Sequence, residues 1–235
     1  MLRTTVSTIL LILTAVSSAA GAEGLWNFAT ARVGQVFESE TSSTCGGAVV
    51  GADLVLTAAH CVVTAESSDP VDPRSLTFSY TEESGQTKVF QVVDIATDPS
   101  FVRRDAPTRD QIARDVALLR LDRYLTGDVE VMAPLDSTQP YVALLPTQEE
   151  APFEGEPCAA EYEDENIVIL SCTRAKGSSG MPAFSLIDGE RKIVAVVSAN
   201  GNRKGEKITF GANPSQMLGA LRWISERRPV PGSFD

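Results

Sequence analysis

The chain has 235 residues, of which 43% are hydrophobic and 22% charged, and its formal net charge is −11. This composition is ordinary for a globular protein, and the length suits one large domain or two small packed cores. The negative charge argues against nucleic acid as a partner, because phosphates would be repelled.

The first 22 residues have the layout of a secretory signal peptide. A positive start at Met1–Arg3 precedes an apolar run, densest at Ile9–Leu13, and small residues follow it. We expect cleavage after Ala22, with Ala20 as the alternative, and export to a periplasm or out of the cell. A membrane anchor is the competing interpretation, but the run is interrupted by Thr and Ser and is shorter than the ~20 apolar residues that a span needs.

Four cysteines follow this segment: Cys45, Cys61, Cys158 and Cys172. An even number in an oxidising compartment predicts two disulfides, for which three pairings are open. Pairing neighbours along the chain would close two short loops, one in each half. A metal site is a poor alternative, because no two cysteines are two to four residues apart and the chain has a single histidine. We expect no metal and no other cofactor.

Short apolar segments separated by turn residues predict a barrel or sandwich of β-strands. In chain order these segments are 48–50, 54–56, 76–80, 89–95, 116–121, 167–170, 183–186, 193–197 and 208–210. Asp188-Gly189 is a tight-turn signal. Residues 122–148 resemble a connection between two halves. Helical spacing is convincing only from Pro214 to Arg228, where Asn213 can cap the helix and Trp223 lies beside the apolar positions.

Three short motifs carry chemically useful side chains in the order His, Asp, Ser. His60 lies in "LTAAHC", Asp115 begins "DVALLRL" and Ser179 lies in "GSSGMP". Each alone has a plain structural interpretation, since a lone histidine is usually structural and a Gly-Ser-Gly segment can be a turn. Together they predict nucleophilic catalysis. A serine hydroxyl needs a base, an imidazole with its ordinary pKa of ~6.5 can take and return the proton, and a buried carboxylate orients the imidazole.

At these motifs the chain resembles the trypsin-like, chymotrypsin-fold serine endopeptidases, and among them the compact bacterial secreted members. Thr57–Cys61 matches the family's histidine motif residue for residue, Asp115–Leu121 matches the aspartate motif closely, and Gly177–Pro182 matches the nucleophile motif with substitutions. The resemblance runs from about Cys45 to the terminal helix, so it covers most of the chain.

The resemblance implies an all-β fold of two packed six-stranded Greek-key β-barrels with a C-terminal α-helix. The signal peptide at 1–22 would precede one peptidase domain, with barrels at about 30–125 and 140–212 and the helix at about 214–228. The active site would lie between the barrels. The disulfides Cys45–Cys61 and Cys158–Cys172 would then brace the histidine segment and the strand leading to the nucleophile loop.

The same resemblance implies the catalytic roles. Ser179 would be the nucleophile, His60 the general base and acid, and Asp115 the orienting carboxylate. The backbone N–H groups of Gly177 and Ser179 would form the oxyanion hole. Ser178 is the rival nucleophile, but the spacing to the flanking glycines favours Ser179.

Two positions depart from the family pattern. Ser178 stands where many members carry an aspartate that pairs with a newly released N-terminus, so we do not expect that zymogen switch. Met181 replaces a residue that is usually small, and we expect it to alter the packing of the nucleophile loop without touching the triad.

The resemblance implies the residues that select the substrate side chain only through their positions relative to the motifs. Thr173 lies where the family has the base of its primary pocket, which argues against a preference for Arg or Lys. Ser198, Ala199 and Asn200 would form the strand that pairs with the substrate backbone. We expect a pocket for small or medium neutral side chains, with an acidic preference through Arg174 as the alternative.

We therefore predict a secreted serine endopeptidase that hydrolyses peptide bonds through an acyl-enzyme intermediate. A non-catalytic binding protein on the same fold is the alternative, motivated by Ser178 and Met181. An ester hydrolase fits less well, because the nucleophile elbow of α/β-hydrolases needs G-x-S-x-G and the order Ser, Asp, His. The expected partner is a polypeptide substrate. We expect a monomer that binds no nucleic acid and, after signal cleavage, no membrane.

Overall fold

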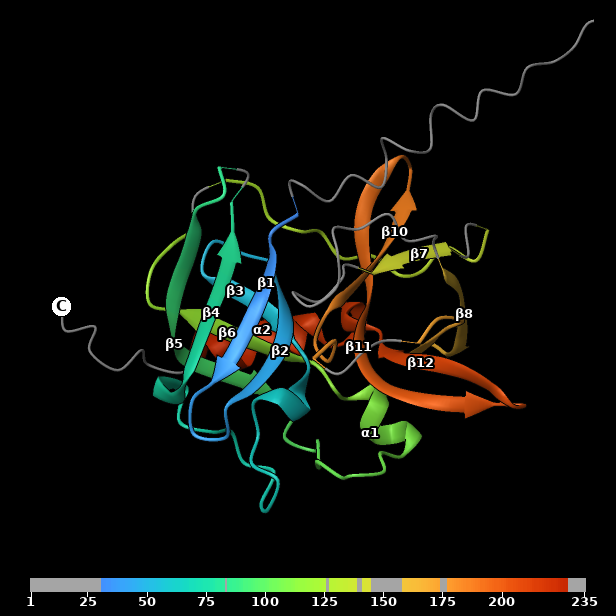
Figure 1. Ribbon diagram of the computed structural model, residues 1–235, viewed down its shortest axis with the longest axis horizontal. Helices are drawn as coiled ribbons and strands as arrows, with labels where there is room; N and C mark the ends of the chain where they lie inside the picture. The colour runs from blue at the N-terminus through green and yellow to red at the C-terminus, as the bar shows by residue number, and fades with distance from the viewer. Residues whose placement is uncertain are drawn as a thin grey trace, which may run out of the picture.

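The computed structural model describes residues 31–82, 84–125, 127–138, 141–144, 158–173 and 177–227. They form two β-barrels that lie side by side (Figure 1). The predicted signal peptide, Arg174 and position 228 of the predicted helix lie outside the described residues. Within the described part of the chain, no helix is long and apolar enough to span a membrane.

The first barrel is closed, with the strand order β1-β2-β3-β6-β5-β4. On β4, alternate side chains point into the barrel, so that Leu76, Phe78 and Tyr80 are buried. The expected hairpin between residues 48 and 56 forms from β2 and β3. The strands are β1 (Val33–Glu38), β2 (Ser43–Val49), β3 (Leu54–Thr57), β4 (Leu76–Thr81), β5 (Thr87–Thr97) and β6 (Ala117–Leu121).

The second barrel is also closed, with the order β10-β11-β12-β9-β8-β7. Asp188 and Gly189 form the turn between β10 and β11 with φ values of 54° and 76°, as their sequence predicts. Part of the expected connection, Tyr141–Leu144, is strand β7, which pairs with both β8 and β10 and so completes this barrel. The remaining strands are β8 (Cys158–Asp164), β9 (Ile167–Leu170), β10 (Pro182–Ile187), β11 (Glu190–Arg203) and β12 (Glu206–Ala212).

The two barrels share an apolar contact. Phe184, Ile193 and Val196 belong to the second barrel, yet they are fully buried in the same cluster as the core of the first. Burial of this surface holds the barrels together through the hydrophobic effect. The short helix α1 (Arg109–Ala113) adds a polar contact, because Arg109 forms an ion pair with Glu163 on β8.

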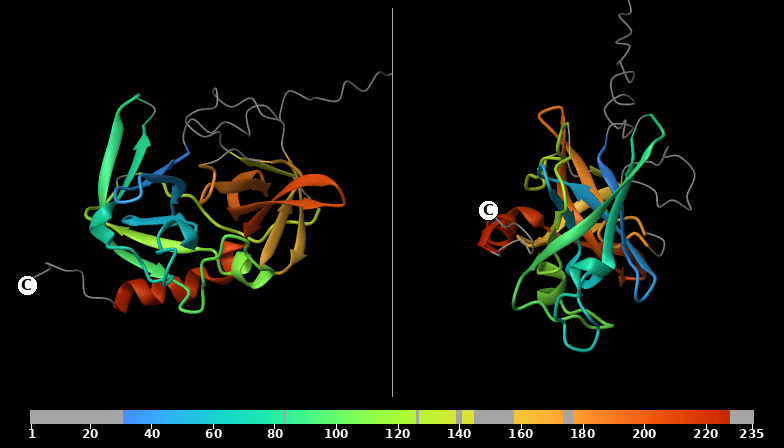
Figure 2. Two further views of the ribbon diagram at one scale, coloured as in Figure 1. Left: turned by 60° about the horizontal axis from the view of Figure 1, so that its bottom comes forward. Right: turned by 90° about the vertical axis from the view of Figure 1, so that its left-hand side faces the viewer.

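The C-terminal segment crosses back onto the first barrel (Figure 2). It begins as a 3₁₀ turn, η4 (Pro214–Gln216), and continues as α2 (Leu218–Arg227), so the predicted single helix has two parts. Asn213 caps η4 by accepting a hydrogen bond from Ser215 N at 3.1 Å. Leu221 is buried against the first barrel, whereas Trp223 is 55% exposed. Met217 and Leu218 pack against the same core, so the helical spacing of these apolar residues corresponds to the face that contacts the barrel.

Both disulfides join neighbouring cysteines along the chain. Cys45 pairs with Cys61 at a Cα–Cα distance of 6.2 Å, and Cys158 pairs with Cys172 at 5.6 Å. The first ties β2 to η2 (Ala59–Cys61), the 3₁₀ turn after β3. The second ties β8 to the chain just after β9. Of the three pairings open from the sequence, the structure selects the one that closes two short loops.

Candidate active site

The carboxylate of Asp115 lies at the centre of the candidate site. Asp115 follows α1 and precedes β6, and it is 3% exposed. Its Oδ1 accepts a hydrogen bond from His60 N at 2.8 Å. Its Oδ2 accepts from Ser198 Oγ at 2.5 Å and lies 2.6 Å from His60 Nδ1. Three donors compensate the buried negative charge, which would otherwise be costly.

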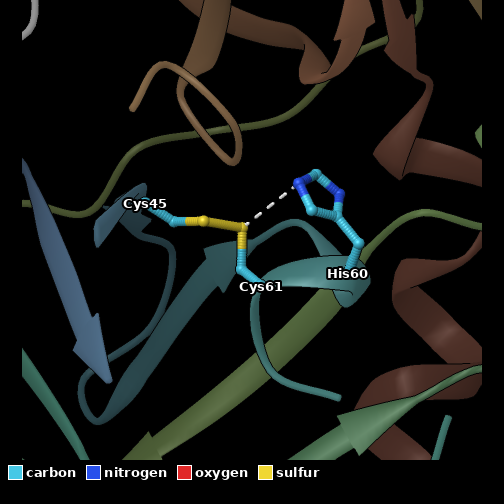
Figure 3. Close-up of side chains that lie close together, drawn as sticks. All are labelled: Cys45, His60 and Cys61. Atoms are coloured by element: carbon cyan, nitrogen blue, oxygen red, sulfur yellow. Dashed lines mark hydrogen bonds between the residues drawn. A yellow bond between two sulfur atoms is a disulfide. The ribbon is translucent and has the colours of Figure 1, made fainter. Parts of the chain in front are cut away.

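His60 is held by the turn that contains it. Its neighbours Ala59 and Cys61 are buried, while the imidazole itself is 24% exposed. The short contact with Asp115 assigns the proton to Nδ1, which leaves Nε2 as an acceptor. Nε2 lies 3.7 Å from the sulfur of Cys61 (Figure 3). Asp115 thus holds the imidazole through Nδ1, and Nε2 points away from the carboxylate.

The loop that carries Ser179 belongs to the second barrel but packs against the first. Gly46 on β2 donates its N–H to the carbonyl of Ser179 at 2.6 Å. Gly180 has φ of +78°, and a Cβ added there would lie 2.4 Å from Gly46 O and 2.4 Å from Thr57 Oγ1. Only glycine permits both this backbone conformation and this close approach. The loop therefore docks on Gly46 of β2 and on Thr57, which ends β3 just before the turn that carries His60.

The same docking brings Ser179 close to the histidine segment through the first disulfide. Gly46 follows Cys45, Cys45 is bonded to Cys61, and the Cys61 sulfur contacts His60 Nε2. Ser179 is half-buried. Among the described residues, no hydrogen bond joins Ser179 Oγ to His60 Nε2. Such bonds are often long without substrate and tighten when substrate binds.

The two adjacent serines of the loop have different environments. Ser178 is 3% exposed, and its Oγ has no hydrogen-bond partner among the described residues. Of the two hydroxyls, the one on Ser179 is therefore the more accessible. This difference agrees with the choice of Ser179 from the motif spacing.

Gly177 adopts a backbone conformation that favours glycine. Its φ is +89°, and no heavy atom lies within 4 Å of the Cβ position. Within the part of the chain that the structure describes, the N–H groups of Gly177 and Ser179 donate to no backbone carbonyl. Two donors close together in sequence are thus available to an external oxygen.

The predicted specificity residues lie around the adjoining strands. Thr173 is exposed at the end of the segment that follows Cys172. The hydroxyl of Thr209 lies 2.7 Å from the carbonyl of Cys172 and 2.9 Å from Asn200 Oδ1. This contact ties the segment before Thr173 to the strand that carries Asn200.

Sequence reasoning missed one of the side chains that bond to the Asp115 carboxylate. Ser198 was expected only to present its backbone to substrate, but its hydroxyl also bonds to Asp115. The pairing of β11 with β12 is irregular between Val197 and Ala199, which sets Ser198 apart from the regular register. No motif in the sequence indicates this role.

Comparison with known proteins agrees with the geometry. Residues 27–150, more than half of the chain, match the family described as Trypsin. The chain therefore belongs to the family of trypsin-like serine proteases. The matched segment includes His60 and Asp115, and Ser179 follows it. No curated protein matches the chain.

Proposed function

We propose that the protein is an exported serine endopeptidase in which Ser179, His60 and Asp115 form the catalytic triad. The observation that carries this proposal is the carboxylate of Asp115, buried between the barrels and bonded to both His60 and Ser198. Such an arrangement fixes the tautomer of an imidazole and stabilises its protonated form. Its position beside the docked nucleophile loop favours catalysis over a purely structural histidine.

The proposed reaction proceeds in two halves. Ser179 Oγ attacks the peptide carbonyl carbon while His60 Nε2 takes the hydroxyl proton, and the N–H groups of Gly177 and Ser179 stabilise the oxygen that becomes negative. The C–N bond then breaks, and His60 gives its proton to the leaving amine. In the second half, His60 takes a proton from water as the water oxygen attacks the acyl carbon. The C–Oγ bond breaks and the proton returns to Ser179.

A non-catalytic binding protein on the same fold is the second candidate. The observation that favours it is the lack, among the described residues, of a hydrogen bond between Ser179 Oγ and His60 Nε2. Against it stands the buried bonding of Asp115, because a histidine without a catalytic role does not need a compensated carboxylate behind it.

Labelling with a fluorophosphonate separates the two candidates. The probe phosphonylates an activated serine with loss of fluoride, and mass spectrometry of the modified peptide identifies the residue. We expect labelling at Ser179 that is abolished by Ser179→Ala and His60→Ala. Ser178→Ala is the matched control and should still be labelled. A folded, disulfide-bonded protein that is not labelled would contradict the endopeptidase proposal and favour the binding protein.

A further inference from the structure

A cavity of about 260 Å³ lies beside His60 on the side of Asp115. Ser198 and Ala199 form one wall. The opposite wall comes from the segment between β5 and α1, which includes Phe101, Arg103 and Arg104. Because His60 lines the cavity, a substrate bound at His60 and Ser179 would lie next to the cavity.

One of the two arginines is held in place by the first barrel. Arg103 donates from Nη1 to the carbonyl of Val63 at 2.9 Å, and its backbone N–H donates to Ser68 Oγ at 2.9 Å. A carbonyl uses one of the five guanidinium donors and does not neutralise the charge. The guanidinium of Arg103 is thus both positioned and able to bind an anion.

The neighbouring Arg104 is exposed, and it forms no ion pair or hydrogen bond with any residue that the structure describes. Its charge is therefore open to solvent or to a bound group. Together the two arginines place two positive charges at the rim of the cavity. This local sign is opposite to the net charge of −11 carried by the whole chain.

Most acidic groups near the cavity are already bonded elsewhere. Asp98 and Asp110 accept hydrogen bonds from Arg114 at 2.9 Å and 3.0 Å. Asp115 is bonded to His60 and Ser198 as described above. The remaining carboxylate on the cavity wall is Asp105, which is exposed. The wall thus carries two arginines and one exposed carboxylate, so its net accessible charge is positive.

An extended substrate would present alternate side chains to this wall. Side chains along a strand point alternately to opposite faces, and a peptide that pairs with Ser198–Asn200 would be extended. If the residue whose carbonyl is attacked directs its side chain toward Thr173, the residue immediately before it faces His60 and the cavity. The third residue before the attacked one points to the same side, because alternate side chains share a face.

We propose that Arg103 and Arg104 make the enzyme prefer substrates with an acidic side chain on this face, at the first or third residue before the one that is attacked. This inference rests on the proposed function and names its substrate class. A carboxylate held by guanidinium groups in a half-enclosed cavity gains charge-assisted hydrogen bonds that an amide of the same size does not.

The test uses two peptide pairs that differ only as Asp against Asn, one at each of these positions. For the wild-type protein we expect kcat/KM to be about tenfold higher for the Asp peptide in at least one pair, which corresponds to ~1.4 kcal/mol. Arg103→Gln/Arg104→Gln should bring the ratio to about one, and Asp105→Asn should raise it. Arg74→Gln removes one positive charge from the first barrel outside the cavity and should leave the ratio unchanged.

The outcomes separate this inference from the proposed function. Fluorophosphonate labelling with cleavage of the Asn peptides, but a ratio near one in both pairs, would overturn the acidic preference and leave the endopeptidase intact. A ratio that persists in the double variant would show that other residues select the acid. Neither labelling nor cleavage would overturn both. High salt should lower a genuine electrostatic preference, because screening weakens exposed ion pairs.

Discussion

Ser198 donates its hydroxyl to Asp115 Oδ2 at 2.5 Å, although the two residues are 83 positions apart and belong to different barrels. The same oxygen lies 2.6 Å from His60 Nδ1. Ser198 therefore helps to set the direction of the carboxylate, and through it the orientation of the imidazole. The bond also joins the second barrel directly to the histidine and aspartate of the first.

Removal of the Ser198 hydroxyl should change kcat more than it changes KM. In Ser198→Ala, Asp115 keeps two of its three donors, and a hydrogen bond to a charged group contributes about 1.5–3 kcal/mol. We expect kcat to fall by roughly 10-fold to 100-fold, with a small change in KM. Steady-state kinetics on one peptide measures both. Ser198→Thr keeps the hydroxyl and should retain most of kcat, and equal losses in the two variants would contradict the role.

Gly46 and Met181 form a second complementary pair between the barrels. A Cβ at position 46 would lie 2.4 Å from Met181 Sδ, 2.5 Å from its Cγ and 2.8 Å from its backbone N. The bulky residue that departs from the family pattern thus occupies space that a glycine leaves open. Met181 is buried in the core of the second barrel, and its effect on the packing of the loop stays a prediction.

Gly46→Ala should therefore disturb the docking of the nucleophile loop. We expect a loss of about 1–3 kcal/mol in the free energy of unfolding, as is typical of overpacked sites, and a matching loss of activity. Met181→Ala removes the two closest contacts, so the double variant should be more stable than the sum of the single changes predicts. Denaturant unfolding of all four proteins gives this coupling, and strict additivity would show that the two residues do not interact.

The fold and the candidate catalytic motifs could be predicted from the sequence because they depend on local patterns. Strands such as β4 and β9 are marked by apolar and β-branched runs, and the Asp188-Gly189 turn by its composition. The short strand β7 lies between prolines in a segment with no long apolar run. Its extended conformation depends on pairing with β8 and β10 rather than on its own composition. The proposed roles of Ser198 and Arg103 depend on contacts between distant segments. No local pattern contains that information.

Ser178 offers a test of stability that leaves the proposed nucleophile in place. Its buried hydroxyl has no partner among the described residues, and an unsatisfied buried polar group costs about 1–3 kcal/mol. Ser178→Ala should therefore leave the protein as stable or raise the free energy of unfolding by about 1 kcal/mol. Ser178→Asp should destabilise it, because a buried charge would lack a partner. Thermal unfolding of both variants provides the measurement, and a large loss in Ser178→Ala would reveal a partner for the hydroxyl.

Glu38, at the end of β1, should make part of the stability depend on pH. Burial alone would raise the pKa of this carboxyl, but hydrogen bonds from the Thr41 hydroxyl and the N–H groups of Glu40 and Thr41 outweigh it and hold the pKa at about 2. These bonds are 2.5–2.8 Å long. A carboxyl with a lowered pKa in the folded state stabilises the protein above its unfolded pKa of about 4.5 and loses that contribution as the pH falls towards 2.

Glu38→Gln should remove this dependence. Between pH 6 and pH 2.5 the wild type should lose on the order of 2 kcal/mol more of its free energy of unfolding than the variant does. Urea unfolding at a series of pH values measures the difference. Glu40→Gln, which removes an exposed carboxylate but keeps the backbone N–H that Glu38 uses, should follow the wild type. Parallel curves for wild type and Glu38→Gln would mean that Glu38 makes the same bonds in the unfolded chain or none in the folded one.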